Sequence, residues 1–379
     1  MVIRYSILWM LPLLCDGGQY KDNFLNQISS PAKDFFRIIF DSIKPQSNQC
    51  GYLDMDGTII TESFPNIVLA KQIEEGAFAF NATDVNLVFG FEAKDLPGNP
   101  DECVEHSKIL ITVDRTQVQI DFNQVVKEIH DIFETKDRRL DKTFEATEVH
   151  DLRNLVALWF KVVFHVLSRK SDKCTYLMMT IPYRLLYKMD EQKSEKLMER
   201  AFNRAITDDG IDEYVYVGSA SQKLQVSIKL QQKASAYPMM VSFIRALKEE
   251  RLNLHIISAS HEVYLRVLTK LLNLEIDIKN IHGTKPHDGD NFTNVLIGNG
   301  YVLGGENKAN KIKELGCPSL IAAGDSKYDK EMLEESLKGG GYALIIGGHK
   351  TVDSLVKLTN TLDYAPRIHL QGVNGIQWK

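Results

Sequence analysis

The chain has 379 residues, of which 44% are hydrophobic and 25% are charged, as in folded globular proteins rather than disordered ones. This length allows two or three domains and a large core. Lys and Arg number 45 against 50 for Asp and Glu, and the resulting net charge of −5 argues against a nucleic-acid partner.

The chain begins with an apolar run from Ile7 to Cys15, preceded by Arg4. The run is too short to span a bilayer and resembles the apolar region of a signal peptide. It also contains a proline, and no clean cleavage site of small residues follows. We treat residues 1–48 as an N-terminal segment in which residues 1–17 are either a signal peptide or part of the buried structure. A cytoplasmic location is slightly favoured over export, and no other segment is apolar enough for an integral membrane span.

The cysteines are odd in number, far apart and without C-x-x-C spacing. This pattern argues against a zinc site and against a framework of disulfides. We expect the cysteines to behave as small apolar residues, and a single disulfide stays open. They are Cys15, Cys50, Cys103, Cys174 and Cys317.

The stretch GYLDMDGTII, residues 51–60, places Asp54 and Asp56 two positions apart at the end of an apolar segment. Residues two apart in a strand point to the same side, so the two carboxylates repel each other unless a cation holds them. Carboxylate and backbone carbonyl oxygens suit Mg²⁺. A strand that simply ends in an Asp-Gly turn is the structural alternative.

Residues 61–236 lack a regular alternation of strands and helices, and we interpret them as a domain inserted after the first strand. Apolar, strand-like stretches come first and helical segments follow. The expected strand-like stretches are 86–92 and 108–122, and the expected helices are 124–135, 152–170 and 190–205.

From residue 237 onward, strands and helices alternate, which predicts an α/β fold with a parallel sheet. We expect a helix over 238–253, a strand over 254–260, a helix carrying Val263, Val267 and Leu271, a hairpin over 294–305, a helix over 307–316, a strand over 319–325, a helix over 329–338 and a strand over 342–348. Residues 49–60 and 237–379 would then form one core. In such sheets, ligands bind at the carboxyl ends of the strands.

Polar side chains with a chemical use lie in a fixed order at these predicted ends. They are Asp54 with Asp56, then Ser258, then Lys308, and then Asp325 with Asp329. Ser258 closes an apolar strand, and Ser260 competes for the same role. Lys308 lies in the first turn of a helix, whereas Lys311 and Lys313 suit a solvated helix face. Ser326 with Asp329 also fits a structural capping box.

This order resembles the haloacid dehalogenase (HAD) superfamily of phosphohydrolases: D-x-D-G-T, a Ser at a strand end, a Lys at a helix start and G-D-S-x-x-D. The resemblance covers residues 50–60 and about 237–350, and it covers the insert by position only. It implies a Rossmann-like parallel-sheet HAD core with a large, mainly helical cap inserted after the first core strand.

The resemblance also implies roles for the residues. Asp54 would be the nucleophile that forms an aspartyl-phosphate, and Asp56 would protonate the leaving alcohol and then activate water. Ser258 and Lys308 would bind the phosphate of the substrate.

The cofactor implied by the resemblance is Mg²⁺. Its ligands would be the carboxylates of Asp54 and Asp325 and the backbone carbonyl of Asp56. Asp329 would support the site by orienting Lys308 or a metal-bound water.

Three segments, ISASHEVYLRVL, AAGDSKYDKEML and LQGVNGIQWK, further resemble bacterial phosphocholine and phosphoethanolamine phosphatases of the phosphoserine-phosphatase-like branch. A small phosphomonoester with a cationic headgroup is therefore the first expectation for the substrate. Glu62 could meet the ammonium group. Aromatic side chains of the insert could face such a cation, although ordinary packing explains each of them: Trp159, Tyr176, Tyr183, Tyr187, Tyr214 and Tyr216.

Two other functions stay open at this point. The first is a phosphatase for a phosphoprotein or a phospholipid headgroup, with the insert as a docking domain. The second is a non-catalytic binding module, which the complete set of acids, Ser and Lys argues against. The oligomeric state stays open as well.

Overall fold

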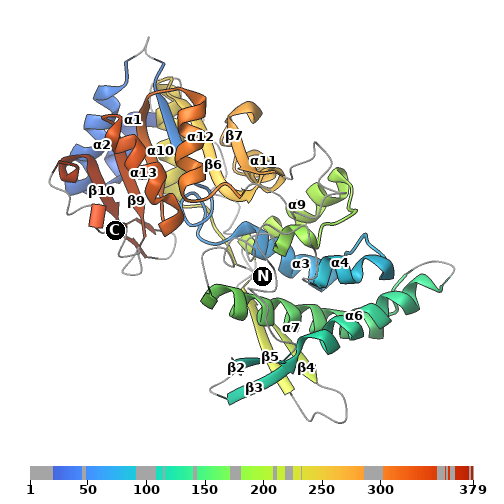
Figure 1. The fold of residues 1–379 in the computed structure, drawn as a ribbon. Helices are drawn as coiled ribbons and strands as arrows, with labels where there is room; N and C mark the ends of the chain where they lie inside the picture. Colours follow the sequence, from blue (N-terminus) through green and yellow to red (C-terminus); the bar gives the residue numbers. More distant parts are fainter. Residues whose placement is uncertain are drawn as a thin grey trace, which may run out of the picture. The chain divides into compact units, whose positions relative to one another are not determined.

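The structure is a computed structural model in which most of the chain is described (Figure 1). The described residues are 20–44, 48–90, 108–113, 116–139, 143–170, 181–207, 211–217, 225–231, 233–285, 302–347, 355, 357–358, 363–374 and 377–378. The chain divides into two compact units, which are considered separately. The first consists of Met1–Phe64, Ala234–Thr284 and Val302–Lys379, and the second of Pro65–Lys233 and Lys285–Tyr301.

The first unit is built on a six-stranded sheet with the order β10-β9-β8-β1-β6-β7, in which every neighbouring pair is parallel. The strands are β1 (Cys50–Leu53), β6 (Asn253–His261), β7 (Ile281–Thr284), β8 (Ser319–Gly324), β9 (Tyr342–Ile346) and β10 (Ile368–Gln371). The predicted α/β fold with a parallel sheet is confirmed. The first strand lies in the middle of the sheet, between strands that come about 200 residues or more later in the chain.

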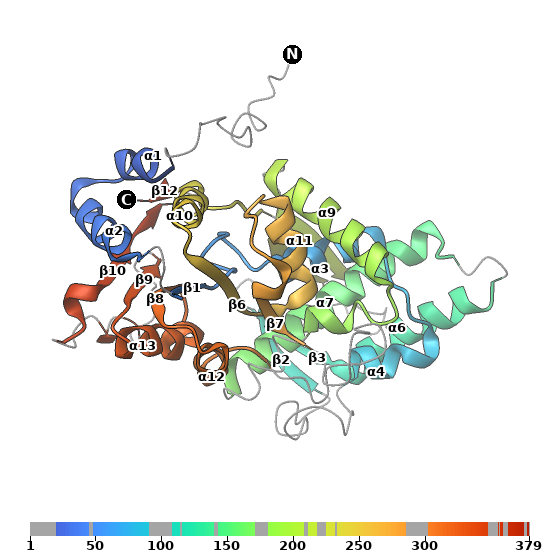
Figure 2. The ribbon, with the colours of Figure 1, turned by 90° about the horizontal axis from the view of Figure 1, so that it is seen from above.

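Helices cover both faces of this sheet, with α1, α2 and α10 on one face and α12 and α13 on the other (Figure 2). The helices of this unit are α1 (Tyr20–Gln27), α2 (Ser30–Ser42), α10 (Pro238–Glu249), α11 (Glu262–Leu271), α12 (Glu306–Leu315) and α13 (Lys330–Lys338). Short pieces complete it: η2 (Ile278–Asn280), η3 (Lys327–Asp329), η4 (Ala365–Arg367), β11 (Val373–Asn374) and β12 (Gln377–Trp378). The predicted alternation after residue 237 is confirmed, except that most of the predicted hairpin over 294–305 lies outside the described residues.

The N-terminal helices α1 and α2, which the sequence patterns did not predict, belong to the core of the first unit. Phe24 of α1 and Phe36 of α2 are fully buried, and their ring centroids are 5.0 Å apart. Both rings contact Phe243 of α10, and Phe36 stacks on Trp378 near the C-terminus. Aromatic contacts of this kind stabilise the attachment of residues 20–42 to the rest of the unit. Residues 1–17, the candidate signal peptide, lie outside the described residues.

A disulfide joins Cys50 and Cys317, with a Cα–Cα distance of 5.8 Å. Cys50 begins β1, Cys317 comes just before β8, and both are buried. Of the two possibilities for the cysteines, small apolar residues or a single disulfide, the structure has the disulfide for this pair. The pairing of β1 with β8 brings the two side chains together across 267 positions, a distance over which spacing in the sequence carries no signal. Cys15, Cys103 and Cys174 lie outside the described residues.

The second unit combines helices with two antiparallel hairpins. Its elements are α3 (Phe64–Glu75, whose first residue belongs to the first unit), η1 (Ala82–Asp84), α4 (Val85–Phe89), β2 (Lys108–Val113), β3 (Thr116–Asp121), α6 (Phe122–Asp137), α7 (Ala146–Lys170), α9 (Glu191–Thr207), β4 (Ile211–Val217) and β5 (Gln225–Gln231). The strands expected within 108–122 and the three expected helices are confirmed, whereas α3 and the hairpin β4–β5 were not predicted.

The strand expected over 86–92 is wrong, because residues 85–89 form helix α4. A capping box precedes it, in which the Asn81 side chain accepts an N–H bond and Asp84 accepts a bond from the Asn81 N–H at 3.0 Å. This box starts a helical turn. Val85, Val88 and Phe89 then lie on one helix face and are fully buried, so an apolar run that suits a strand serves a helix equally well.

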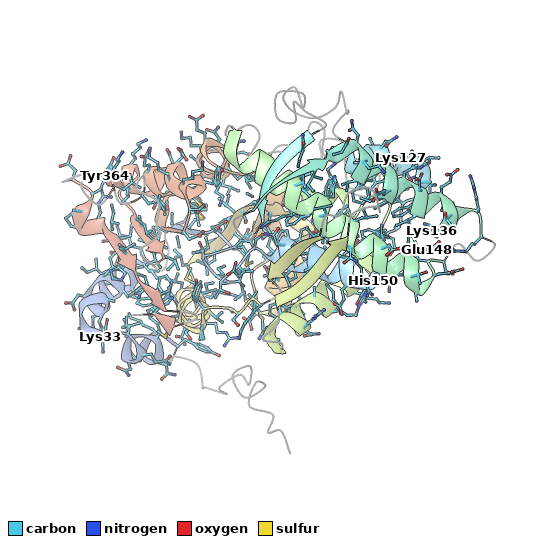
Figure 3. All side chains as sticks on the ribbon, turned by 90° about the horizontal axis from the view of Figure 1, so that it is seen from below. Lys33, Lys127, Lys136, Glu148, His150 and Tyr364 are labelled. Carbon is cyan, nitrogen blue, oxygen red and sulfur yellow. A yellow bond between two sulfur atoms is a disulfide. The ribbon has the colours of Figure 1, made fainter. Side chains whose placement is uncertain are left out.

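The helices α6 and α7 are joined at one end by charged contacts. Arg139 donates two hydrogen bonds of 2.5 Å to Glu148 of α7, and the Lys136 ammonium of α6 lies 4.9 Å from the ring centroids of Phe133 and Phe144. Lys136 and Glu148 are labelled in Figure 3.

No helix within the described residues is both long enough and apolar enough to cross a membrane.

We expect the disulfide to contribute to stability, because it closes a 267-residue loop and so restricts the unfolded chain. The double variant Cys50→Ser with Cys317→Ser should lose about 2–5 kcal/mol of unfolding free energy in denaturant titrations. Reductant should destabilise the native protein and leave the double variant unchanged. Equal stability of the native protein with and without reductant contradicts this prediction.

Candidate active site

The acidic motif lies at the carboxyl edge of the central strands. Asp54 follows β1, and its N–H donates to the Ala323 carbonyl of β8 at 3.0 Å, which continues the strand pairing. Asp325 follows β8, and Ser258 lies in β6, on the other side of β1 (Figure 2). Three adjacent parallel strands therefore carry the predicted site residues to one edge of the sheet.

Lys308 is the cation of this edge. It is 2% exposed, and its Nζ lies 2.7 Å from Asp54 Oδ1 and 2.5 Å from Asp329 Oδ1. Burial opposes the charge on Lys308, but the carboxylates of Asp329 and Asp54 outweigh it and raise the pKa of the ammonium. Lys311 and Lys313, the rival lysines, pair with glutamates instead.

Asp329 is held by both of its oxygens. Oδ1 receives Lys308, while Oδ2 accepts bonds from the Ser326 hydroxyl at 2.8 Å, the Ser326 N–H at 2.9 Å and the Asp325 N–H at 3.2 Å. The capping box that was the structural alternative is thus present, and the same carboxylate also binds the lysine. A side chain fixed in this way positions Lys308 rather than moving with it.

Asp56 is held separately from Asp54. Its Oδ1 accepts the N–H of Phe64, the first residue of α3, at 2.8 Å, and its Oδ2 accepts the hydroxyl of Ser260. Burial raises the pKa of Asp56, and these two hydrogen bonds oppose that effect. Burial and the hydrogen bonds therefore act in opposite directions on the same proton, while the two bonds hold the carboxyl group in one orientation.

The two serines of β6 have different partners. Ser260 is engaged by Asp56, a contact that the sequence did not reveal, although residues 258 and 260 had to share one face of a strand. Ser258 is 2% exposed, and its hydroxyl oxygen accepts the Ser260 N–H at 3.4 Å, which leaves the hydroxyl proton for another acceptor.

The carboxylates of Asp54, Asp325 and Asp329 fit a metal ion, because their oxygen atoms all lie within 4.8 Å of one another. Burial raises the pKa of Asp54 to about 7 and that of Asp325 to about 8, and Lys308 opposes both shifts. Keeping both carboxylates charged therefore costs free energy, and a divalent cation would remove that cost. The side chain of Asp56 is engaged elsewhere, so only its backbone carbonyl is available for the predicted ligand role.

Gly57 leaves the space that this arrangement needs. Its φ is +79°, and a Cβ at this position would come within 2.2 Å of Asp325 Oδ2. The next residue, Thr58, donates from its hydroxyl to Asp325 Oδ1 at 3.4 Å. The glycine of the motif is thus explained by the close approach of the backbone to the Asp325 carboxylate, and the threonine by its hydrogen bond to the same group.

The aromatic residues considered for a cation differ in what the structure offers. Trp159 is fully buried, and its indole N–H donates to the Phe89 carbonyl at 2.8 Å, so it packs in the core of the second unit. Tyr183 is buried as well, and Tyr187 has the Lys188 ammonium 5.4 Å from its ring centroid. Tyr176 lies outside the described residues, and for Tyr214 and Tyr216 of β4 the structure describes the backbone only.

One solved structure shows a similar fold over most of the chain. The crystal structure of a conserved protein of unknown function from Anaerococcus prevotii has a TM-score of 0.69 to this chain, with 16% identity over 91% of this chain and 93% of that chain. A HAD family hydrolase from Salmonella enterica subsp. enterica serovar Typhi has a TM-score of only 0.36 and 12% identity over 93% of this chain and 83% of that chain. No curated protein matches the chain.

The sequence model of the haloacid dehalogenase-like hydrolases matches residues 141–334. This range includes Ser258, Lys308, Asp325 and Asp329 and begins after the D-x-D-G-T motif. Because the match covers slightly more than half of the sequence, the chain belongs to the haloacid dehalogenase-like hydrolase family.

Proposed function

We propose that the chain is a Mg²⁺-dependent phosphomonoester hydrolase with Asp54 as its nucleophile. The observation that supports this most is the buried contact of Lys308 with Asp54 and Asp329. Lys308 holds Oδ1 of Asp54, and no described residue hydrogen-bonds Oδ2, which is therefore free to attack phosphorus. The attack forms the aspartyl-phosphate and releases the alcohol, and water then cleaves the aspartyl-phosphate to phosphate.

Asp56 would serve as the acid and base in these two steps. In the first step it gives its proton to the leaving alcohol oxygen, and in the second it takes a proton from the attacking water. Ser260 and the Phe64 N–H keep the Asp56 carboxyl oriented, and burial raises its pKa towards the range in which both tasks are feasible. Ser258 would donate its hydroxyl proton to a phosphate oxygen.

Mg²⁺ would be held by the Asp54 and Asp325 carboxylates and the Asp56 carbonyl, with Asp329 as a positioning residue. When bound, it supplies positive charge that neutralises the phosphate oxygens. Lys308 contributes a fixed positive charge of its own, and the hydrogen bonds on Asp329 keep that charge in place.

For the substrate we propose a small phosphomonoester with a cationic headgroup, such as phosphocholine or phosphoethanolamine. Glu62 supports this choice, because it is exposed and lies eight positions after Asp54, so its carboxylate can meet an ammonium group. The groups at the strand ends serve the phosphate and the metal. Selectivity among alcohols would therefore come from residues 61–236, which include Glu62, acting as a cap domain.

Replacing the nucleophile tests the reaction itself. Asp54→Asn should lower kcat by about 1,000-fold or more, because an amide cannot form the acyl-phosphate. Beryllium fluoride with Mg²⁺ should form an adduct on Asp54 in the native protein. Asp34→Asn, on the exposed face of α2, is the matched control and should keep full activity. Retention of more than about a tenth of the turnover in Asp54→Asn excludes this mechanism.

The stabilisation of the fold by Mg²⁺ should increase as pH rises. Without metal, the folded-state pKa values of Asp54 and Asp325 lie above their ordinary value of 3.8, at about 7 and about 8. Folding stability then falls as pH rises across this window, because the unfolded chain gives up its protons first. Mg²⁺ reverses the loss, so the increase in Tm on adding Mg²⁺ should be larger at about pH 8.5 than at about pH 5.5. EDTA should abolish activity, and full turnover in excess chelator is incompatible with the proposal.

The choice of substrate is tested by comparing kcat/KM values. Phosphocholine should exceed glycerol phosphate by about tenfold or more, and Glu62→Gln should reduce that preference by up to about fivefold. Both activities should fall together if Glu62 merely stabilises the fold. A phosphotyrosine peptide that exceeds phosphocholine by tenfold supports the docking-domain alternative instead.

A further inference from the structure

The strand β6 is irregular where it carries the two serines of the site. Its pairing with β7 shifts between Ile257 and His261, where four steps along β6 correspond to two along β7. The extra residues of β6 lie in the segment 258–260, which contains both serines. Extra residues in a strand bend it and change the direction of its side chains, and they are frequent next to active sites.

The strand β7 holds this irregular segment in place. The Thr284 hydroxyl donates to the Ala259 carbonyl at 2.6 Å. Gly283 allows a close approach, because a Cβ at this position would come within 2.6 Å of the Ser260 carbonyl oxygen. The Ser260 N–H donates to the Ser258 hydroxyl at 3.4 Å, and Ser260 is buried. The backbone of Ser260 is therefore fixed by contacts on both sides.

The hydroxyl of Ser260 reaches Asp56. It donates to Oδ2 of the carboxyl group, and the Phe64 N–H donates to Oδ1 at 2.8 Å. The two donors differ, because a backbone N–H can only donate a hydrogen bond, whereas a hydroxyl can also accept one. Ser260 can donate to Asp56 when it is a carboxylate and, after its O–H bond turns, accept from Asp56 when it is an acid. The hydroxyl therefore suits both protonation states of Asp56.

On the proposed function, Asp56 changes its protonation state twice. First, Oδ2 of Asp54 bonds to phosphorus, the bond from phosphorus to the alcohol oxygen breaks, and that oxygen takes the proton of Asp56. Asp56 then takes a proton from the water that cleaves the aspartyl-phosphate. We propose, on the basis of this function, that Ser260 is a positioning residue that keeps the Asp56 carboxyl in one orientation through both proton transfers. Ser258 has the separate task of binding the phosphate.

The effect of removing the Ser260 hydroxyl should depend on the alcohol that leaves. Glycerol is a poor leaving group unless its oxygen is protonated, whereas p-nitrophenolate is a stable anion that needs little protonation. In Ser260→Ala, kcat/KM should fall by about 10- to 100-fold for glycerol phosphate and by less than about threefold for p-nitrophenyl phosphate. Because kcat/KM covers the steps up to the release of the alcohol, this comparison isolates the first proton transfer.

The second proton transfer is common to both substrates and is measured by kcat. For p-nitrophenyl phosphate, kcat and KM of Ser260→Ala should fall together, because the aspartyl-phosphate accumulates when water is activated poorly. Rapid mixing should then show a burst of p-nitrophenol before the steady state. A serine that merely stabilises the fold produces neither the burst nor the difference between the substrates.

Three variants serve as comparisons. Ser260→Thr keeps the hydroxyl and should retain the native ratio of the two kcat/KM values, a ratio that does not depend on the fraction of protein that is folded. Ser258→Ala should lower both values by the same factor, because Ser258 serves the phosphate. Ser42→Ala is the matched control: it removes a hydroxyl that donates to the Ile38 carbonyl of α2 at 2.7 Å, and it should change neither value.

The outcomes separate the role of Ser260 from the proposed function. Equal losses of kcat/KM for the two substrates in Ser260→Ala, without a burst, overturn the inference and leave the proposed function standing. A native protein that hydrolyses neither substrate in the presence of Mg²⁺ overturns both.

Discussion

The buried contact of Lys308 with two carboxylates is the interaction on which the candidate site depends. Without the lysine, Asp54 and Asp329 would be two buried anions close to Asp325, which is costly because a buried charge needs a partner. Without the carboxylates, the ammonium would be a buried cation with no partner. Breaking such a pair costs more than forming it gains, so each member requires the others. The site is therefore a single electrostatic unit.

The order of the strands brings the members of this unit together. The nucleophile follows the central strand, and the segments that neutralise or position it follow strands on either side of β1. Parallel strands bring their carboxyl ends to the same edge, so residues far apart in the chain become neighbours. The disulfide joins the starts of β1 and β8, the strands that carry Asp54 and Asp325 at their other ends. It stabilises the pairing of these strands at the edge opposite the carboxylates.

Different groups would bind the phosphate and the alcohol part of the substrate. The charged unit treats all phosphomonoesters alike, because its groups serve phosphate and metal. In our proposals, the charged unit binds the phosphate and Glu62 meets the alcohol part of the substrate. Selectivity among alcohols then depends on groups outside the charged unit, and Glu62→Gln tests one of them.

The sequence by itself determined the parallel α/β fold, the strand ends at which polar residues lie and the residue types of the site. These properties depend on local periodicity and on the chemistry of Asp, Lys and Ser, which neighbours in the chain reveal. Only the tertiary structure decided which partner each group has: Ser260 rather than Ser258 for Asp56, both oxygens of Asp329, and Cys50 with Cys317. It also made residues 85–89 a helix. Such choices depend on strand register and packing between segments up to 267 residues apart, and no local pattern encodes them.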